Sequence, residues 1–314
     1  MSVYEPNTIN KIHYRMLAKR NGFELIKKAF SLTDEELLSI INYINENNYQ
    51  TIPIFNEGGK RKIKYSRTKY HIHQLKWLNE SLKLAFIADK HIGYIHDKFE
   101  YIEKAYNKIA KWGADYVFDL GDFFDGPVQK SYNPSTCRLH TLEEALLEVQ
   151  KYHPKEILTH FITGNHEIGF MDIDGVDIGR VIEEILPNMQ FLNNLFTCID
   201  INGLRVNLSH GSIEKKYLNY INLEREYKFL NNNSPHIISQ AHGHISGATL
   251  KRDILLNQVP SLTFYGKHHH KRTGIVLLEI YDAANQYEMV HHSIHFNEEE
   301  KEETQELILR KNEN

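Results

Sequence analysis

The chain has 314 residues, of which 41% are hydrophobic and 25% are charged, and its formal net charge is −4. This length and composition are typical of a folded protein of about two domains, and they exclude a disordered chain and a disulfide-stapled mini-protein. No apolar run approaches the ~20 residues that cross a bilayer, and the first residues lack the basic and apolar blocks of a secretory signal. Two cysteines, Cys137 and Cys198, are too few for a disulfide framework. We therefore expect no membrane partner and a reduced, cytoplasmic setting.

Charge is divided unevenly along the chain. Residues 1–80 hold 13 lysines and arginines against 8 acidic residues, a net charge of +5, which leaves −9 for residues 81–314. Such an asymmetry indicates two parts with separate tasks. The chain also holds 19 histidines, and because histidine is the commonest metal ligand, this number favours a metal site.

The first predicted block, residues 1–80, begins with helical patterns. Apolar residues recur at helical spacing in residues 23–30. A second helix is predicted after Thr33, because Thr33 and Glu36 match the S/T-x-x-E capping box. Its apolar repeat continues through residues 37–44, and the following asparagines are expected to end it.

A predicted hairpin closes this block. Strand-like segments at 51–55 and 62–65 flank a turn signal at 56–59, and helices followed by a hairpin resemble a winged helix-turn-helix. Six of the ten residues 60–69 are basic, which places positive charge on the predicted wing. We expect this wing to contact nucleic acid, through Lys60, Arg61, Lys62, Lys64 and Arg67. A protein contact, an autoregulatory role and a merely solvated hairpin stay open.

From residue 81 the pattern changes to strand-length apolar runs and amphipathic helices. Helical repeats stand at 102–109 and 142–149. The strand-like segments are 84–88, 116–118, 157–163, 196–209, 236–241, 260–265, 273–281 and 286–296. This alternation predicts an α/β layered domain over residues 81–297, followed by a charged tail, 298–314, that reads as helical or frayed.

Polar side chains stand directly after several of the predicted strands. The segments are Asp89-Lys90-His91, Gly121-Asp122-Phe123-Phe124-Asp125, Gly164-Asn165-His166-Glu167, Ser209-His210-Gly211 and Ala241-His242-Gly243-His244. Ligands of α/β sheets gather beyond the carboxyl ends of the strands, so five such ends can converge on one spot. Carboxylates, imidazoles and one amide oxygen suit Mn, Fe, Zn or a similar ion rather than a cysteine-based zinc site. Seven such groups are too many for one ion but fit two, held ~3.5–4 Å apart by a bridging carboxylate.

Each group taken alone has a more ordinary explanation. Asp89 and Asn165 stand where turn-forming residues are common, and His210 alone reads as a hydrogen-bonded loop or core histidine. The run His268-His269-His270 lies in a basic loop and is either an accessory substrate contact or ordinary solvated chain. Only the ordered set of strand-end motifs points to metal ions.

In this order the motifs D-x-H, G-D-x-x-D, G-N-H-E, H-G and H-x-H resemble those of the calcineurin-like metallophosphoesterase superfamily, over roughly residues 82–296. The resemblance implies a four-layer α-β-β-α sandwich, and the small winged-helix-like domain predicted from residues 1–80 would precede it. It implies one metal ion held by Asp89, His91, Asp122 and His244. It implies a second held by Asp122, Asn165, His210 and His242. His166 would lie near the scissile phosphate.

Two residues depart from the commonest family pattern. Ala241 stands where the last motif usually has glycine, and we expect only a local adjustment there. Lys90 occupies the middle of D-x-H, where a small or polar residue is more usual. We expect Lys90 to point to solvent, with a phosphate contact as the alternative.

The resemblance implies phosphoester hydrolysis by a hydroxide that bridges two divalent cations. Asp122 would bridge the cations, and His166 would donate a proton to the leaving oxygen or steady it by a hydrogen bond. Mn²⁺ is favoured, while Fe, Zn, Ni and Mg stay open. Residues 89–93 and 121–125 are similar to those of DNA double-strand-break repair nucleases, and the predicted domain order resembles phage- and mobile-element-encoded phosphoesterases. The first hypothesis is therefore a phosphodiesterase or nuclease acting on nucleic acid.

Two other functions stay open. One is a phosphatase or phosphodiesterase for small nucleotides or phosphomonoesters, with the N-terminal block as a lid or partner site. The other is an inactive DNA-binding regulator, against which the complete ligand set argues, since a scaffold can lose ligands without penalty. The charge of −9 on residues 81–314 weakens the first hypothesis, because nuclease grooves are commonly basic. The wing or a partner chain would supply the attraction, and the sequence leaves a homodimer and a partner protein equally open.

Overall fold

The computed structural model describes residues 5–17, 22–47, 54–57, 60–63, 72–125, 135–173, 175–211, 235–251, 253–263, 273–284, 286–296 and 301–310. The helices in these ranges are α1 (Pro6–Leu17), α2 (Phe23–Phe30), α3 (Asp34–Asn47), α4 (Phe99–Trp112), α5 (Leu142–Tyr152), α6 (Asn165–Ile173) and α7 (Ile178–Ile185). The first eight strands are β1 (Ile54–Glu57), β2 (Lys60–Ile63), β3 (Ile72–Leu75), β4 (Ser81–Ile87), β5 (Tyr116–Asp119), β6 (Thr159–Thr163), β7 (Met189–Asn194) and β8 (Phe196–Ile201). The remainder are β9 (Leu204–His210), β10 (Ile237–Ala241), β11 (Gly247–Lys251), β12 (Ile254–Gln258), β13 (Gly274–Ala283), β14 (Gln286–His295) and β15 (Lys301–Arg310). No described helix is long and apolar enough to span a bilayer.

The N-terminal part has its own apolar core. Side chains from α1, α2 and α3, among them Ile12, Ile26 and Ile41, are fully buried against one another. The predicted capping box is confirmed, because the Thr33 amide donates to Glu36 Oε2 at 2.7 Å and the Glu36 amide donates to Thr33 Oγ1 at 3.2 Å. β1 and β2 pair antiparallel across the predicted turn. Three helices and a hairpin stand in this order, and the winged-helix assignment of residues 1–80 stays a prediction.

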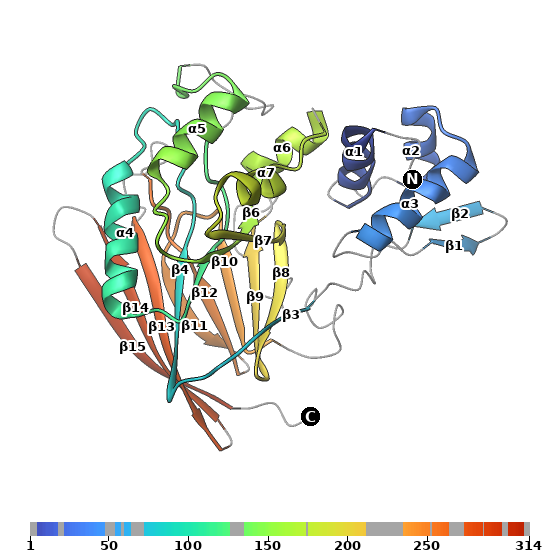
Figure 1. Ribbon diagram of the computed structural model, residues 1–314. Coiled ribbons are helices and arrows are strands. Elements are labelled where there is room, and N and C mark those ends of the chain that lie inside the picture. Colours follow the sequence, from blue (N-terminus) through green and yellow to red (C-terminus); the bar gives the residue numbers. More distant parts are fainter. Residues whose placement is uncertain are drawn as a thin grey trace.

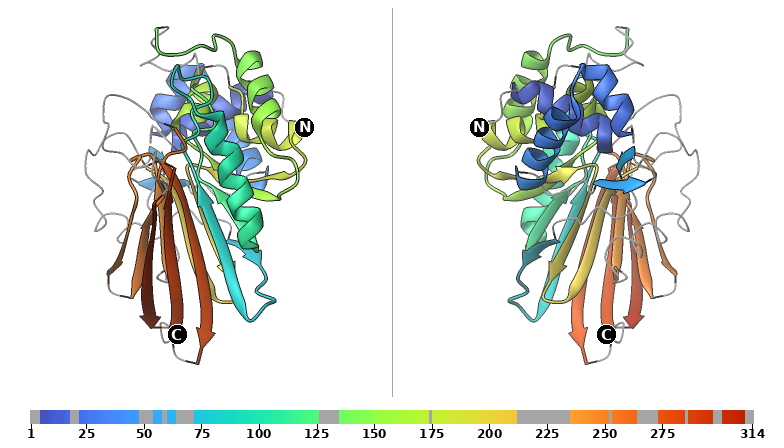
Figure 2. Two further views of the ribbon diagram at one scale, coloured as in Figure 1. Left: turned by 90° about the vertical axis from the view of Figure 1, so that its left-hand side faces the viewer. Right: turned by 90° about the vertical axis from the view of Figure 1, so that its right-hand side faces the viewer.

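Two sheets lie face to face in the remainder of the chain (Figures 1 and 2). The seven-stranded sheet has the order β15-β14-β13-β4-β5-β6-β7, in which β4 to β7 run parallel. The six-stranded sheet has the order β11-β12-β10-β9-β8-β3, in which β9, β10 and β12 run parallel. This arrangement confirms the predicted α/β sandwich.

Alternation along β4 explains how the layers pack. Leu84 and Phe86 lie in the apolar core between the two sheets. Ala85 and Ile87 point to the opposite face, where they lie in a second core with side chains of α4 and α5. Successive side chains of a strand point to opposite faces, so a strand with apolar residues at every position is buried on both. The strand ends that carry the motifs are thus anchored from two sides.

Three segments differ from the sequence prediction. β3 falls in the predicted first block, yet it pairs in parallel with β8, so the six-stranded sheet begins at Ile72. The expectation of a helical or frayed tail is wrong, because β15 pairs antiparallel with β14 along its whole length and buries Leu307. The predicted strand at 260–265 does not form within residues 260–263, where only Ser261 makes an isolated bridge, to Thr273.

The N-terminal helices contact the two-sheet domain at one of its site-bearing helices. α1 packs against α6 (Figure 1). Asn10 Nδ2 donates to the Gly175 carbonyl at 3.0 Å, and Gly175 has a left-handed φ of 72°. A Cβ at Gly175 would overlap the carbonyl of Asn7, so only glycine allows this approach. α6 opens with Asn165 and His166, so the N-terminal part rests on a helix that supplies two candidate site residues.

Candidate metal centre

Five strand ends meet at one edge of the sandwich, as the sequence predicts. β4, β5 and β6 are parallel neighbours in one sheet, and β9 and β10 are parallel neighbours in the other (Figure 1). Their carboxyl ends therefore lie at the same edge. The candidate residues brought together there are Asp89, His91, Asp122, Asn165, His166, His210, His242 and His244. Each of them is buried or half-buried.

The backbone at this edge is unusual. Side-chain-bearing residues rarely adopt a positive φ, which costs roughly 1–3 kcal/mol and clusters at functional sites. Five candidate ligands have left-handed φ values between 44° and 80°: Asp89, His91, Asp122, His242 and His244. Surrounding contacts must therefore hold these loops in place, and their strained conformation is what aims the five side chains at common points.

The first cluster joins Asp89, His91 and His244. The Nε2 atoms of the two histidines lie 3.2 Å apart, and Asp89 Oδ1 lies 3.2 Å from His244 Nε2 and 3.7 Å from His91 Nε2. The other oxygen of Asp89 accepts a hydrogen bond from the His242 amide at 3.1 Å. Two imidazole nitrogens and one carboxylate oxygen thus converge on a single point, which is the arrangement of a metal site.

The second cluster joins Asp122, Asn165, His210 and His242. His210 Nε2 lies 3.0 Å from Asp122 Oδ2 and 3.1 Å from Asn165 Oδ1. His242 supplies a ring nitrogen within 4.8 Å of the ligand atoms of Asp122 and His210. His210 Nδ1 donates to the Leu120 carbonyl at 2.7 Å, which fixes the ring and directs Nε2 toward the other ligand atoms.

Asp122 lies between the two clusters. Its Oδ2 is 3.0 Å from His210 Nε2 in the second cluster and 3.8 Å from His91 Nε2 in the first. Its Oδ1 accepts a hydrogen bond from the His166 amide at 3.0 Å, which orients the carboxylate. The aspartate that the motifs predict to be shared by two cations is thus within reach of both clusters.

A third contact involves Asp125, to which the sequence analysis gives no role. Asp125 Oδ1 lies 2.9 Å from His166 Nδ1 and 3.7 Å from His91 Nδ1. Burial raises the pKa of Asp125, but hydrogen bonds from His166 and His91 outweigh it and hold that pKa well below the usual range. The second aspartate of G-D-x-x-D is the signal that could have found this residue.

Charge is concentrated in the metal-free site. Burial alone would lower the pKa of His91, but hydrogen bonds with Asp125 and Asp89 and the charge of Asp122 raise it to about 10. Burial would also lower the pKa of His210, but the charge of Asp122 outweighs burial and raises that pKa to about 9. Burial also opposes ionisation of Asp122, yet the charges of His210 and His166 keep its pKa well below normal. A cation bound here would need these imidazoles in their neutral form.

The donor set fits divalent cations. Asp89 Oδ1 and Asp122 Oδ2 are buried, and within the described ranges neither accepts a hydrogen bond in good geometry. A buried carboxylate oxygen without such a partner is costly unless a positive charge faces it. Imidazole nitrogens together with carboxylate and amide oxygens are ligands of Mn, Fe and Zn. A divalent cation held among these ligands would supply such a charge.

The sequence matches the family described as calcineurin-like phosphoesterase over residues 82–272, which is more than half of the chain. The chain belongs to this family. The expectation of a metal-dependent phosphoester hydrolase with a divalent metal site is thereby confirmed. No curated protein matches the chain.

Solved structures with a similar fold share little sequence with this phosphoesterase. A novel archaeal phosphodiesterase is 16% identical, with a TM-score of 0.42 over 73% of this chain and 100% of its own. A predicted phosphoesterase of Streptococcus pneumoniae is 12% identical, with a TM-score of 0.39 over 73% and 100%. Zn²⁺-complexed Vps29 of Entamoeba histolytica is 13% identical, with a TM-score of 0.44 over 72% and 99%.

Glu167 holds the Asp122 loop of the phosphoesterase from behind. Its Oε2 accepts hydrogen bonds from the amides of Asp122 and Gly164 at 3.0 and 2.8 Å, and its Oε1 accepts from the Phe123 amide at 2.8 Å. Burial and the charge of Asp122 raise the pKa of Glu167, although the hydrogen bond from the Gly164 amide lowers it. The sequence analysis includes Glu167 in G-N-H-E without a role, because amide acceptors leave no spacing signal.

The expectation for Lys90 is wrong in both of its forms. Lys90 points neither to solvent nor to the site: it is buried, its ammonium pairs with Asp119, and it lies 3.8 Å from the centroid of the Phe123 ring. Asp89 and His91 contribute ligand atoms to the first cluster, whereas the Lys90 side chain is directed to Asp119 and to the ring of Phe123.

The predicted nucleic-acid contacts cannot be placed relative to this centre. Lys60, Arg61 and Lys62 lie on β2, where the structure describes the backbone but not the side chains. Lys64, Arg67 and the run of histidines 268–270 lie outside the described residues. Their roles stay predictions.

Proposed function

We propose that this phosphoesterase binds two divalent cations side by side and hydrolyses phosphodiester bonds of nucleic acid. One observation carries the proposal: Asp122 Oδ2 lies 3.0 Å from His210 Nε2 and 3.8 Å from His91 Nε2. These imidazoles belong to different clusters, so one carboxylate faces both. A bridging carboxylate lets two cations stand ~3.5–4 Å apart, the separation typical of two-metal phosphoesterases.

The clusters divide the ligands between the two cations. The first cation would be held by Asp89, His91, His244 and Asp122. The second would be held by Asp122, Asn165, His210 and His242. When bound, the cations neutralise phosphate oxygens and lower the pKa of water. Mn²⁺ is the favoured ion, and Fe and Zn accept the same mixed oxygen and nitrogen ligands.

His166 is placed to handle the leaving group. Its Nδ1 faces Asp125 Oδ1 at 2.9 Å, and its Nε2, on the other side of the ring, lies 3.8 Å from Asp122. The imidazole therefore presents Nε2 to the place where the clusters meet. A proton on Nε2 can pass to the leaving oxygen or stabilise it by a hydrogen bond, which contributes typically ~10²–10⁴-fold to a rate.

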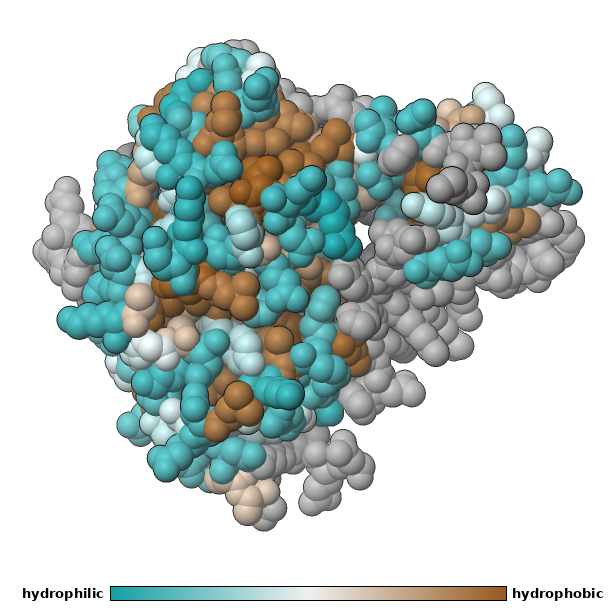
Figure 3. All heavy atoms as spheres, viewed as in Figure 1, coloured by the Kyte–Doolittle hydropathy of each residue, from teal (hydrophilic) through white to brown (hydrophobic). Residues whose placement is uncertain are grey.

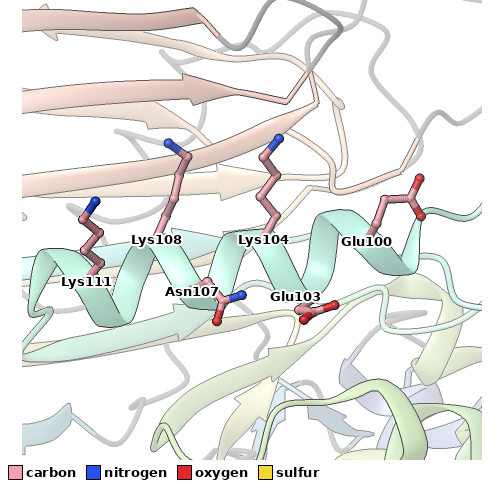
Figure 4. Close-up of a pocket in the computed structure, with 6 residues that line it drawn as sticks. All are labelled: Glu100, Glu103, Lys104, Asn107, Lys108 and Lys111. Carbon is pink, nitrogen blue, oxygen red and sulfur yellow. The ribbon is translucent and has the colours of Figure 1, made fainter.

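A row of lysines supports nucleic acid as the substrate. Lys104, Lys108 and Lys111 point to the same side of α4 and line a hollow of about 320 Å³ (Figure 4). The flank on which α4 lies is mainly hydrophilic (Figure 3). The amide of Gly93, two residues after His91, donates at 2.7 Å to Asp97, which lies two residues before α4, and Glu100 and Glu103 line the hollow beside the lysines. Lysines in such a row attract a phosphate backbone without reading its sequence.

The chemical step is tested with purified protein stripped of metal and resupplied with Mn²⁺. The substrates are a small phosphodiester, a phosphomonoester, single-stranded DNA and duplex DNA. We expect cleavage of DNA and of the small diester, lost in Asp122→Asn and strongly reduced in His166→Ala. Cleavage of the monoester alone would favour the small-substrate alternative, and DNA binding without turnover under any metal would favour an inactive regulator. Either outcome contradicts the proposal.

The substrate class is tested by the lysine row. Changing Lys104, Lys108 and Lys111 together to glutamine should raise KM for DNA several-fold and leave turnover of the small diester unchanged. Exposed Lys76, Lys151 and Lys155, changed in the same way, serve as the charge-matched control. Neutralising residues 60–62 of β2 should weaken DNA binding independently. A parental KM for DNA in the variant of the lysine row, together with parental DNA binding in the variant of residues 60–62, would contradict a nucleic-acid substrate.

A further inference from the structure

A buried ion pair lies directly behind the metal-binding loops. Lys90 and Asp119 are 1% and 0% exposed, and the Lys90 ammonium pairs with Asp119 Oδ2. The same ammonium lies 3.8 Å from the centroid of the Phe123 ring. Neither residue is a proposed cation ligand or proton donor. A buried ion pair contributes little net stability once the loss of hydration is counted, so stability alone does not account for this one.

The pair touches the Asp122 loop on both sides of Asp122. Asp119 is the last residue of β5, and its Oδ1 accepts a hydrogen bond from the Gly121 amide at 3.1 Å. The Asp119 carboxylate therefore joins Lys90, on the β4 loop, to the residue directly before Asp122. Phe123, whose ring faces the ammonium, is the residue directly after it.

The two loops also meet through their backbones. The amide of Asp89 donates to the Gly121 carbonyl at 2.9 Å, and the amide of His91 donates to the Asp122 carbonyl at 3.0 Å. Asp89, His91 and Asp122 all have left-handed φ values, of 53°, 44° and 54°. Such a backbone persists only where its surroundings over-determine it. The ion pair is one of the contacts that support this strained junction, beside the hydrogen bonds that Glu167 accepts from the amides of Asp122 and Phe123.

We propose that Lys90 and Asp119 form a positioning pair that sets where Asp122 stands relative to Asp89 and His91. The pair thereby determines whether a single carboxylate can face both cations. This inference rests on the proposed two-cation function. The pair is neutral as a whole, so it adds no net charge to a site that is rich in carboxylates. Its role is geometric.

The test separates geometry from charge and from folding. Single variants mix these effects, because Lys90→Met leaves Asp119 uncompensated and Asp119→Asn leaves a lone ammonium near the cations. The double variant Lys90→Met/Asp119→Asn stays neutral, conserves volume and keeps an acceptor for the Gly121 amide. Its metal-free thermal midpoint is measured in EDTA, and Mn²⁺ binding by calorimetry and electron paramagnetic resonance. Turnover of a small diester is measured last.

We expect the double variant to fold with a thermal midpoint within a few degrees of the parent. It should bind Mn²⁺ roughly 10-fold or more weakly, lose the spin-coupled dimanganese signal, and lower kcat more than KM. Parental Mn²⁺ affinity and a parental coupled signal would overturn the inference. The control is Lys83→Met/Glu279→Gln, which removes a 3.8 Å ion pair at the far end of β4. It should change neither the Mn²⁺ affinity nor the spin-coupled signal.

Two safeguards keep the result decisive. If the double variant does not fold, Phe123→Leu removes the ring that faces the ammonium while keeping both charges. It should weaken Mn²⁺ binding in the same direction, and parental affinity there would overturn the inference. A parent protein that binds two Mn²⁺ ions but hydrolyses no phosphoester contradicts the proposed function alone, because the comparison of Mn²⁺ affinities still decides the role of the pair.

Discussion

The Oδ1 atom of Asp125 lies 2.9 Å from Nδ1 of His166, so the carboxylate contacts the imidazole directly. The same oxygen lies 3.7 Å from Nδ1 of His91. Asp125 therefore supports both the proposed proton donor and a proposed cation ligand, each through the ring nitrogen that faces away from the substrate side. A group in this position fixes ring orientation and tautomer without touching the phosphate.

Asp125→Asn should lower kcat for a small diester roughly 10–100-fold and change KM little, because His166 loses its fixed orientation. Steady-state kinetics with saturating Mn²⁺ measure the effect. Asp115→Asn is the control for loss of a hydrogen-bonding carboxylate, since Asp115 is an exposed aspartate that accepts the Lys83 amide at 2.8 Å, away from the strand ends that carry the site. Equal losses in the two variants would show that Asp125 has no special role.

Mn²⁺ binding should weaken as pH falls. The pKa of His91 is about 10 and that of His210 about 9 in the metal-free site, because nearby carboxylates outweigh burial. A cation needs the neutral imidazole nitrogen, so binding near neutral pH must displace about two protons. Calorimetry in buffers of different ionisation enthalpy counts them. Affinity that does not change between about pH 6 and pH 8 would contradict the protonated state of the metal-free site.

Gly164→Ala should abolish the metal site while the chain still folds. A Cβ at Gly164 would overlap the side chain of Asp122, so the alanine methyl must push the shared carboxylate out of place. We expect loss of Mn²⁺ binding and of hydrolysis, with far-ultraviolet circular dichroism unchanged. Gly22→Ala is the matched control, because nothing lies within 4 Å of its added Cβ. Mn²⁺ binding by Gly164→Ala at parental affinity would show that Asp122 is not a ligand.

The metal-free protein should lose stability as pH falls below 6.5. Burial, aided by the charge of Lys90, lowers the pKa of His153 to about 3, and burial lowers that of His160 to about 4. Each histidine is neutral in the fold and ionises more readily when unfolded. Its contribution to stability is therefore complete above the ordinary value of 6.5 and is lost as pH falls toward the folded value.

The expected loss is roughly 2 kcal/mol for each histidine by about pH 5. Urea unfolding in EDTA at pH 7 and pH 5 measures it. His160→Gln removes one of the two groups and should flatten the dependence of the free energy of unfolding on pH. A variant with the same pH dependence as the parent would show that His160 does not carry it.

Much of the site could be predicted from sequence, because its residues stand immediately after apolar strands. Parallel strands bring their carboxyl ends to one edge, so the order of motifs already places Asp89, Asp122 and His210 together. The capping box could be predicted equally well, since Thr33 and Glu36 lie within four residues of each other. A local pattern with a fixed spacing can be recognised in the sequence without knowledge of how the remainder of the chain folds.

The parts that escaped prediction depend on partners far apart in the chain. Lys90 reads as a surface lysine because its partner, Asp119, is 29 residues away. Glu167 holds backbone amides near Asp122, and an amide acceptor has no sequence signature. β15 reads as a charged tail, because acidic side chains mask the alternation that buries Leu307 against the sheet. Asn165 follows a glycine like a turn residue, yet it opens α6.

The number of Mn²⁺ ions bound by Asp122→Asn, compared with the parent and with His242→Ala, tests the shared carboxylate most directly. We predict two ions with a spin-coupled signal in the parent, one weakened ion in His242→Ala, and both ions weakened together in Asp122→Asn. A parent that binds a single ion, or an Asp122→Asn variant that keeps one ion at parental affinity, would contradict a site built on one aspartate between two cations.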